Sequence, residues 1–245
     1  MVDLAVSERG EGRPFLWAHG LTSSRRSEDA SGLFDWSGVP GRVIRYDARS
    51  HGESPTSTDP DDHRWPTLAG DLLALADDLG LDRFACGGAS MGCATTLHAA
   101  VRAPDRIERM VLVIPPTAWE TRAAQAALYE DLAALPPADL KAGMAARPVP
   151  PLFADEPDLA RRLPDIPDEV LATVLTGARR SDLPPREALR SLTQPTLVLA
   201  WDTDPGHPVS TAEALHELLP TSELSVATTL ADVRRWPEKV AAFLA

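Results

Sequence analysis

Short apolar runs alternate with longer amphipathic segments along most of the chain. The runs are continuous rather than alternating, as in strands covered on both faces of a sheet. They predict strands at residues 15–18, 42–46, 84–86, 110–114, 196–200 and 223–226, with a candidate edge strand at 4–7. Apolar positions three and four residues apart predict helices at 68–79, 90–102, 210–219 and 234–244, and a capping box is expected to open the third at Ser210. This alternation is typical of βαβ units, so we expect an α/β fold with a mostly parallel sheet of about seven strands flanked by helices.

Residues 116–192 interrupt this alternation. They contain no strand-like run, but prolines separate short helical stretches at 121–135, 138–146, 157–163 and 167–178. We therefore expect a helical cap at 116–192, inserted at one end of the sheet between two parts of a core at 1–115 and 193–245.

The composition narrows the class of protein without identifying it. The chain has 245 residues, of which 44% are hydrophobic, and a net charge of −12. This suits one large globular domain, and the acidic balance argues against a nucleic-acid binder. No apolar run is long enough to cross a membrane, and the first residues lack the regions of a signal peptide. Cys86 and Cys93 are the only cysteines, which excludes a disulfide framework. We expect a cytoplasmic protein that uses no cofactor and no metal.

A candidate nucleophile lies between the predicted strand at 84–86 and the helix that follows. Gly88-Ala89-Ser90-Met91-Gly92 matches the G-x-S-x-G pattern of a nucleophile elbow. Its glycines permit a sharp turn with a strained backbone at the serine. The Ser90 hydroxyl then stands above the sheet at the positive end of a helix, where a developing anion is stabilised. The alternative is a chance match in an ordinary loop, but the strand before it and the helix after it favour the elbow.

A second strand end supplies a candidate oxyanion loop, Trp17-Ala18-His19-Gly20-Leu21. A turn at His19-Gly20 directs the backbone N–H of Leu21 toward the point that the N–H of Met91 also faces. Two converging donors are what a tetrahedral acyl intermediate needs. We therefore predict an oxyanion hole formed by Leu21 and Met91.

These motifs resemble those of the α/β-hydrolase fold superfamily, in the small cap-bearing branch of 3-oxoadipate enol-lactonases, carboxylesterases and cofactor-free haloperoxidases. The resembling stretches are His19-Gly20, residues 46–52, the elbow at 88–92, residues 196–204 and Trp236-Pro237-Glu238. The resemblance implies the α/β-hydrolase fold and a serine hydrolase that cleaves a small carboxylic ester or lactone through an acyl-enzyme. The cap varies within that family and carries no specific signal.

In this family the acid follows the serine in the chain, and the histidine comes last. The penultimate predicted strand is followed by Trp201-Asp202-Thr203-Asp204, with Trp201 where the family usually has glycine. The spacing favours Asp204 as the acid over Asp202. An ordinary turn before Pro205-Gly206 is the alternative interpretation of Asp204.

The family's usual histidine is missing. Its expected position, counted back from Pro237, falls near Leu230, and no histidine occurs after His216. His207 is the remaining candidate, because Pro208 biases it away from helical conformation and so keeps it in a loop at the carboxyl end of a strand. We predict His207 as the substitute base, oriented by Asp204, Asp202, a backbone carbonyl or Glu120. The alternative is that His207 only contacts substrate.

The other histidines, His19, His51, His63, His98 and His216, fit structural or solvent-exposed roles better. We predict substrate contacts from His19, Gly20, Trp119 and Trp201, with Arg147, Arg161 and Arg162 of the cap as candidates for attracting an anionic substrate. Two other functions stay open: a catalytically degenerate binding protein for small molecules, and a perhydrolase or C–C hydrolase of the same fold. The oligomeric state, including a homodimer, is also open.

Overall fold

The computed structural model describes residues 3–146, 148–160 and 163–245. Its strands are β1 Val6–Arg9, β2 Pro14–Ala18, β3 Arg42–Tyr46, β4 Phe84–Ala89, β5 Ile107–Val113, β6 Thr196–Trp201 and β7 Ser222–Ala227. They form one seven-stranded sheet in the order β1-β3-β2-β4-β5-β6-β7. β1 runs antiparallel to β3, and all other neighbouring strands are parallel. The predicted α/β fold with about seven strands is confirmed.

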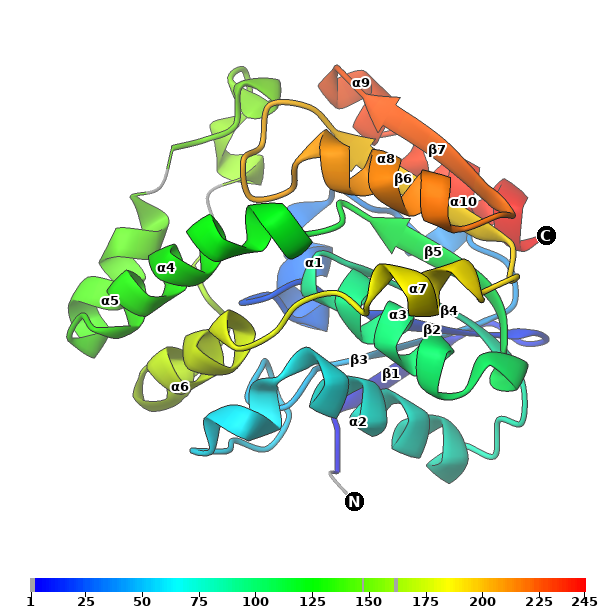
Figure 1. Ribbon diagram of the computed structural model, residues 1–245, viewed down its shortest axis with the longest axis horizontal. Coiled ribbons are helices and arrows are strands. Elements are labelled where there is room, and N and C mark those ends of the chain that lie inside the picture. The colour runs from blue at the N-terminus through cyan, green and yellow to red at the C-terminus, as the bar shows by residue number, and fades with distance from the viewer. Residues whose placement is uncertain (1–2, 147, 161–162) are drawn as a thin grey trace.

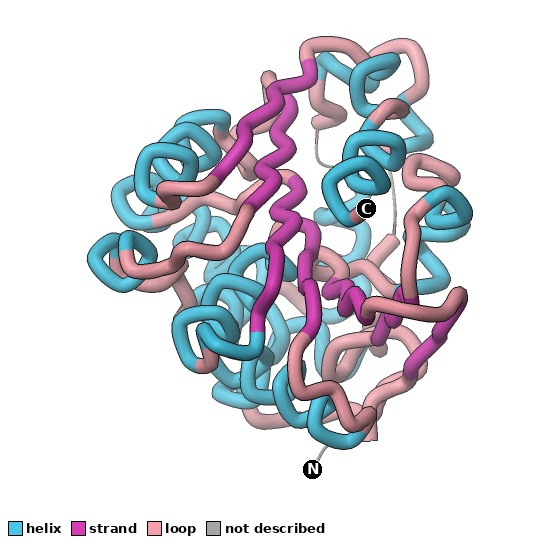
Figure 2. Tube along the Cα trace, turned by 90° about the vertical axis from the view of Figure 1, so that its right-hand side faces the viewer, coloured by secondary structure: helices cyan, strands magenta, loops and turns pink. Residues whose placement is uncertain are grey.

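Helices cover both faces of this sheet, which explains why its strands are continuous apolar runs. One layer contains α2 Trp65–Asp78, α3 Met91–Arg102 and α8 Val209–Leu218; the other contains α1 Arg25–Ser31, α9 Leu230–Val233 and α10 Trp236–Leu244. Figure 1 shows α2, α3 and α8 in front of the sheet, and Figure 2 shows the strands between helices on either side. Along β2, Leu16 packs in the core beside α2 and α3, whereas Phe15 and Trp17 pack in the core beside α10. Each face of the strand is therefore buried in its own apolar layer.

The segment between β5 and β6 is helical, with α4 Arg122–Ala133, α5 Pro137–Ala145, α6 Asp168–Arg179 and α7 Arg186–Arg190. The first three lie on the side toward which the arrowheads of β5 and β7 point (Figure 1). They share a separate apolar cluster that includes Leu132, Leu140 and Leu171. In contrast, α7 packs beside α3 and α8 of the core. The division into core and cap at 116 and 192 stays a prediction.

The helix predicted to open with a capping box at Ser210 differs from expectation at its start. The helix expected at 210–219 begins at Val209, and its N-cap is Pro208 with no side-chain hydrogen bond to the helix end. Ser210 therefore lies inside the first turn, two residues after the N-cap position, and the predicted capping box is wrong. Among the described residues, no helix is long and apolar enough to cross a membrane.

Candidate active site

Ser90 occupies the turn between β4 and α3 in a strained conformation. Its φ is 52° and its ψ is −108°, in a region that side-chain-bearing residues rarely adopt. The backbone is held there by the hydrogen bond from Ser90 N–H to Val113 O, 3.0 Å. A Cβ on Gly88 would lie 2.5 Å from Ala18 O, and one on Gly92 would lie 2.0 Å from the same atom. Glycine is required at both positions because α3 approaches β2 too closely for any side chain.

The loop that follows β6 brings a histidine and a carboxylate to this serine. His207 Nε2 lies 2.8 Å from Ser90 Oγ, and His207 Nδ1 lies 2.7 Å from Asp204 Oδ2. When Nδ1–H donates to the carboxylate, Nε2 is left to accept the serine proton. The turn is closed by a hydrogen bond from His207 N–H to Asp204 O, 3.1 Å, so an acid only three residues before the histidine reaches the far ring nitrogen.

Asp204 is held as an anion by its surroundings. Burial alone raises the pKa of this carboxyl, but the hydrogen bond and charge of His207 outweigh it and hold the pKa well below its usual range. The N–H of Gly206 donates to Oδ1 at 2.9 Å, and Nε1 of Trp201 donates to Oδ2 at 3.2 Å. An ionised, fully hydrogen-bonded carboxylate can orient the imidazole and stabilise its protonated form.

The loop at residues 19–22 runs against the elbow. A Cβ on Gly20 would lie 3.5 Å from Ala89 O and 3.7 Å from Ser90 Cβ. No described residue accepts a hydrogen bond from the backbone N–H of Leu21 or of Met91. Both predicted donors are therefore unused by the described part of the chain.

His19 and His51 support this loop from beneath. His19 is buried, and its Nε2 accepts from Ala48 N–H at 2.9 Å. His51 accepts from Thr22 N–H at 3.3 Å through Nε2, while its Nδ1 donates to Arg49 O at 2.8 Å. Burial lowers the pKa of His19, and it lowers the pKa of His51 to about 3. Both rings stay neutral at physiological pH, as their acceptor nitrogens require.

Ser90, Asp204 and His207 open onto a cavity of about 380 Å³. Gly20 and Trp201 line it as predicted from the sequence, together with Leu21. Most of the remaining wall is apolar, and its aromatic part consists of Trp17, Phe34, Trp36, Phe153, Trp201 and Trp236. The sequence pattern did not assign the side chain of Trp17 in β2 to this wall, and it gave no signal for Phe34 and Trp36, since the segment after α1 carries no motif. It also missed Glu28 of α1, a wall carboxylate that contacts Trp17.

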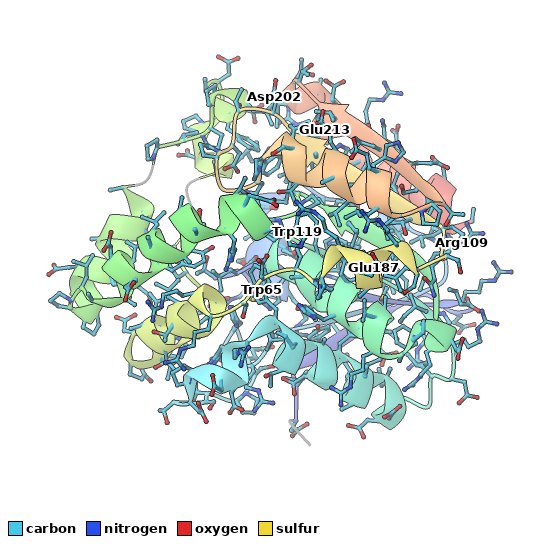
Figure 3. All side chains as sticks on the ribbon, viewed as in Figure 1. Trp65, Arg109, Trp119, Glu187, Asp202 and Glu213 are labelled. Carbon is cyan, nitrogen blue, oxygen red and sulfur yellow. The ribbon has the colours of Figure 1, made fainter. Side chains whose placement is uncertain are left out.

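Several predicted contacts lie elsewhere. Trp119 does not line the cavity: its Nε1 donates to Pro184 O at 3.1 Å, and the Arg186 guanidinium lies 4.3 Å from its ring (Figure 3). Glu120 forms an ion pair with Arg186 and does not orient His207. His19 faces Ala48 rather than the cavity, and Asp202, also labelled in Figure 3, is not part of the wall. Arg147, Arg161 and Arg162 lie outside the described residues. The described part of the chain contains no cluster of three His, Cys, Asp or Glu side chains that fits a metal ion.

Comparison with known proteins agrees with this architecture. Residues 16–143 match the family described as the alpha/beta hydrolase fold. The chain belongs to this family. It is 28% identical over 194 residues to 3-oxoadipate enol-lactonase 2 of Acinetobacter baylyi, which covers 75% of this chain and 69% of that protein. It is also 34% identical over 98 residues to the mouse sn-1-specific diacylglycerol lipase, a match that spans 40% of this chain but only 31% of the lipase. Among solved structures, a thermophilic esterase from Thermogutta terrifontis has a TM-score of 0.75 at 26% identity, with 98% of this chain and 91% of that chain covered.

Proposed function

We propose that this α/β-hydrolase is a serine hydrolase that cleaves a small carboxylic ester or lactone through an acyl-enzyme on Ser90. The observation that carries the proposal is the chain of hydrogen bonds from Ser90 Oγ through His207 to Asp204. A serine hydroxyl, a histidine that accepts its proton and a carboxylate that orients the histidine define a catalytic triad by geometry, whatever their order in the sequence.

The first half-reaction transfers the acyl group to the enzyme. Ser90 Oγ attacks the substrate carbonyl carbon while its proton passes to His207 Nε2. The carbonyl oxygen becomes an oxyanion, which accepts hydrogen bonds from the unused N–H groups of Leu21 and Met91. When the tetrahedral intermediate collapses, the C–O bond to the alcohol breaks and His207 returns the proton to the leaving oxygen.

The second half-reaction restores the enzyme. A water molecule gives its proton to His207 Nε2 and its oxygen attacks the acyl carbon, and collapse then releases the acid and reprotonates Ser90. In a lactone the alcohol and the acid are the two ends of one molecule, so the same steps open the ring. Asp204 stays ionised throughout and stabilises the imidazolium of each step.

The substrate class follows from the cavity and from the relatives. A volume of about 380 Å³ is at the lower end of the range for small-molecule sites. Its largely apolar wall suits the hydrocarbon part of an ester. The named activities of the enol-lactonase and esterase relatives support hydrolysis of carboxylic esters or lactones.

The test is turnover of p-nitrophenyl acetate by the parent and by Ser90→Ala, His207→Gln and Asp204→Asn. We expect Ser90→Ala to abolish measurable turnover and His207→Gln to lower kcat by about 10²- to 10⁴-fold, the usual contribution of a general base. His216→Gln is the matched control, because His216 is an exposed histidine of α8 whose ring, among the described residues, hydrogen-bonds to Ser222 alone. Labelling of Ser90 by a fluorophosphonate provides a second readout.

Each outcome decides between functions. Equal rates for the parent and Ser90→Ala would eliminate the serine hydrolase. No turnover and no labelling of the parent would instead favour a binding protein. A His207→Gln variant as active as His216→Gln would keep the nucleophile but remove His207 as the base.

A further inference from the structure

Asp165 lies in the cap segment that precedes α6, and it contacts two loops of the core at once. Its backbone N–H donates to Thr22 O at 2.9 Å, and its carbonyl accepts from Gly52 N–H at 2.9 Å. Its carboxylate accepts from the Ser24 hydroxyl at 2.5 Å and pairs with Arg26 at 2.7 Å. No other described residue of the cap makes comparable hydrogen bonds to the loop at 20–24.

This loop is the one that carries the N–H of Leu21. Thr22, the next residue, has a φ of 66°, a left-handed conformation that costs a threonine free energy unless its neighbours hold it. Two anchors hold Thr22 from opposite sides: His51 accepts from its N–H, and Asp165 donates to its carbonyl. The N–H of Leu21 belongs to the peptide unit just before these anchors, and the carbonyl of that unit, Gly20 O, accepts from Ser23 N–H at 3.0 Å, so the anchored turn also orients the Leu21 N–H.

Ser24 extends the contact into α1. Its side chain is buried and caps the helix by accepting from Ser27 N–H at 3.0 Å, while its hydroxyl proton goes to Asp165. Removing the carboxylate leaves this buried donor without its acceptor, and a buried unsatisfied group destabilises its local conformation. Arg26 matters less, because its side chain is 76% exposed and an exposed ion pair contributes little.

We infer that Asp165 is a positioning residue, which holds the loop at 20–24 so that the Leu21 N–H faces the Ser90 reaction centre. Through Asp165 the orientation of this N–H depends on the position of the cap. This inference rests on the proposed function. Asp165 is not part of the cavity wall. It acts on the reaction through Leu21, at the two steps in which an oxyanion forms, the attack of Ser90 and the attack of water.

The inference predicts a particular kinetic pattern for Asp165→Ala with p-nitrophenyl acetate. A donor that acts on the oxyanion contributes in the transition state and not in the ground state, so kcat falls while KM changes little. We expect kcat to fall about tenfold to hundredfold, less than complete loss of an oxyanion donor because Asp165 keeps its backbone hydrogen bonds. Asp165→Asn retains an oxygen that can accept from Ser24 and should recover part of this loss.

The matched control is Asp61→Asn, which breaks the ion pair between Asp61 and Arg180, the C-cap residue of α6 and another contact of the cap with the core. We expect its kcat and KM to match those of the parent. If Asp165→Ala does not fold, Ser24→Gly removes the same hydroxyl while keeping a residue that helix N-caps tolerate, and it should lower kcat in the same way. A rise in KM with unchanged kcat, or no change at all, would overturn the inference.

A second readout separates this inference from the proposed function. Amide hydrogen exchange of the segment that contains residues 20–24 requires no turnover. It should be faster in Asp165→Ala than in Asp61→Asn, and equal exchange in the two variants would refute the positioning role even if Ser90 were not a nucleophile. If Ser90→Ala is inactive while Asp165→Ala behaves like Asp61→Asn, the hydrolase stands and only this inference fails.

Discussion

Glu28 is a largely buried carboxylic acid beside the candidate active site, and its titration should be visible in the stability of the protein. It belongs to α1 and lines the cavity. Trp17 Nε1 lies 3.1 Å from both of its oxygens, and Arg45 Nη2 lies 3.2 Å from Oε2. Burial raises the pKa of Glu28 from 4.5 to about 7, although Arg45 and Trp17 act in the opposite direction.

Proton linkage determines whether the free energy of unfolding rises or falls with pH. Between pH 4.5 and pH 7 the folded chain keeps a proton on Glu28 that the unfolded chain has lost, so the free energy of unfolding decreases as the pH rises. A shift of this size makes the Glu28 contribution about 2 to 3 kcal/mol less favourable at pH 8 than at pH 5. Glu28→Gln resembles the protonated acid at every pH and should lack this decrease.

The assay is urea unfolding of the parent and Glu28→Gln at pH 5, 6, 7 and 8. We expect the free energy of unfolding of Glu28→Gln, relative to that of the parent, to increase by about 2 to 3 kcal/mol from pH 5 to pH 8. Buried histidines contribute equally to both proteins and cancel in the difference. Asp29→Asn controls for loss of an acidic partner of Arg45, since Asp29 pairs with the same guanidinium from the next position of α1. A difference that does not change with pH would refute the raised pKa.

Three further predictions test other parts of the site. Trp201→Phe removes the indole donor to Asp204 but keeps an aromatic ring, so kcat should fall about twofold to tenfold in ester hydrolysis; an unchanged kcat would show that this donor does not tune the acid. Gly92→Ala should cost more than about 4 kcal/mol of stability or prevent folding, because its Cβ would collide with Ala18 O. The control is Gly143→Ala in α5, whose Cβ meets only ordinary contacts and which should be neutral or stabilising. Thermal melts of the parent and both variants measure the two effects. Burial lowers the pKa of His51 to about 3. Below pH 6.5 the unfolded chain therefore binds a proton at His51 that the folded chain does not bind, and the free energy of unfolding decreases as the pH falls. His51→Gln should lose about 2 kcal/mol less than the parent between pH 8 and pH 5 in urea unfolding, and an equal loss would contradict the neutral buried ring.

The features that the sequence predicted well are those encoded by neighbouring residues. The strand that precedes Ser90 and the helix that follows it are specified by local apolar pattern and by glycines that leave room for Ala18. The position of His207 in a loop followed from Pro208 and from the helix expected to begin after it. The structure brings Ser90, His207 and Asp204 together as the sequence analysis expected, and their catalytic roles stay predictions.

The features that the sequence could not supply depend on contacts between distant segments. Trp119 was expected in the cavity because it lies in the predicted cap, which should cover Ser90, but its backbone has a positive φ of 49° and its ring contacts Arg186 of α7 instead. Conversely, Glu28 and Trp17 are neighbours only because α1 folds back over the end of β2. His63, which lies among polar residues, is buried rather than exposed, because α6 packs against it at Gly177, and its Nε2 hydrogen-bonds to Ser50. The local sequence pattern predicts whether a segment is a helix or a strand, but not which distant side chains its residues contact.

The unusual position of the candidate base is consistent with the geometry of the sheet. β4, β5, β6 and β7 are parallel neighbours, so the loops that follow them meet at the same edge, where Ser90 also lies. In the family that the sequence resembles, the histidine lies in the loop after the last strand. Here the loop after β7 leads into α9, whose N-terminus is capped by Thr229. The loop after β6 is one strand nearer to β4, and a histidine placed there has less distance to cover.

This placement has a consequence for how the site tolerates change. Asp204 and His207 share one short turn, closed by the hydrogen bond between their backbones and fixed to the cap side by Thr117 N–H, which donates to Gly206 O at 3.2 Å. Acid and base therefore move together, and their mutual distance does not depend on how β6 and β7 pack. What does depend on packing is the distance from this turn to Ser90, which Trp201 controls by stacking on Trp236 at 5.6 Å and by donating to Asp204. Substitutions around Trp201 should consequently weaken the contact between His207 and Ser90 before they disturb the pair of Asp204 and His207.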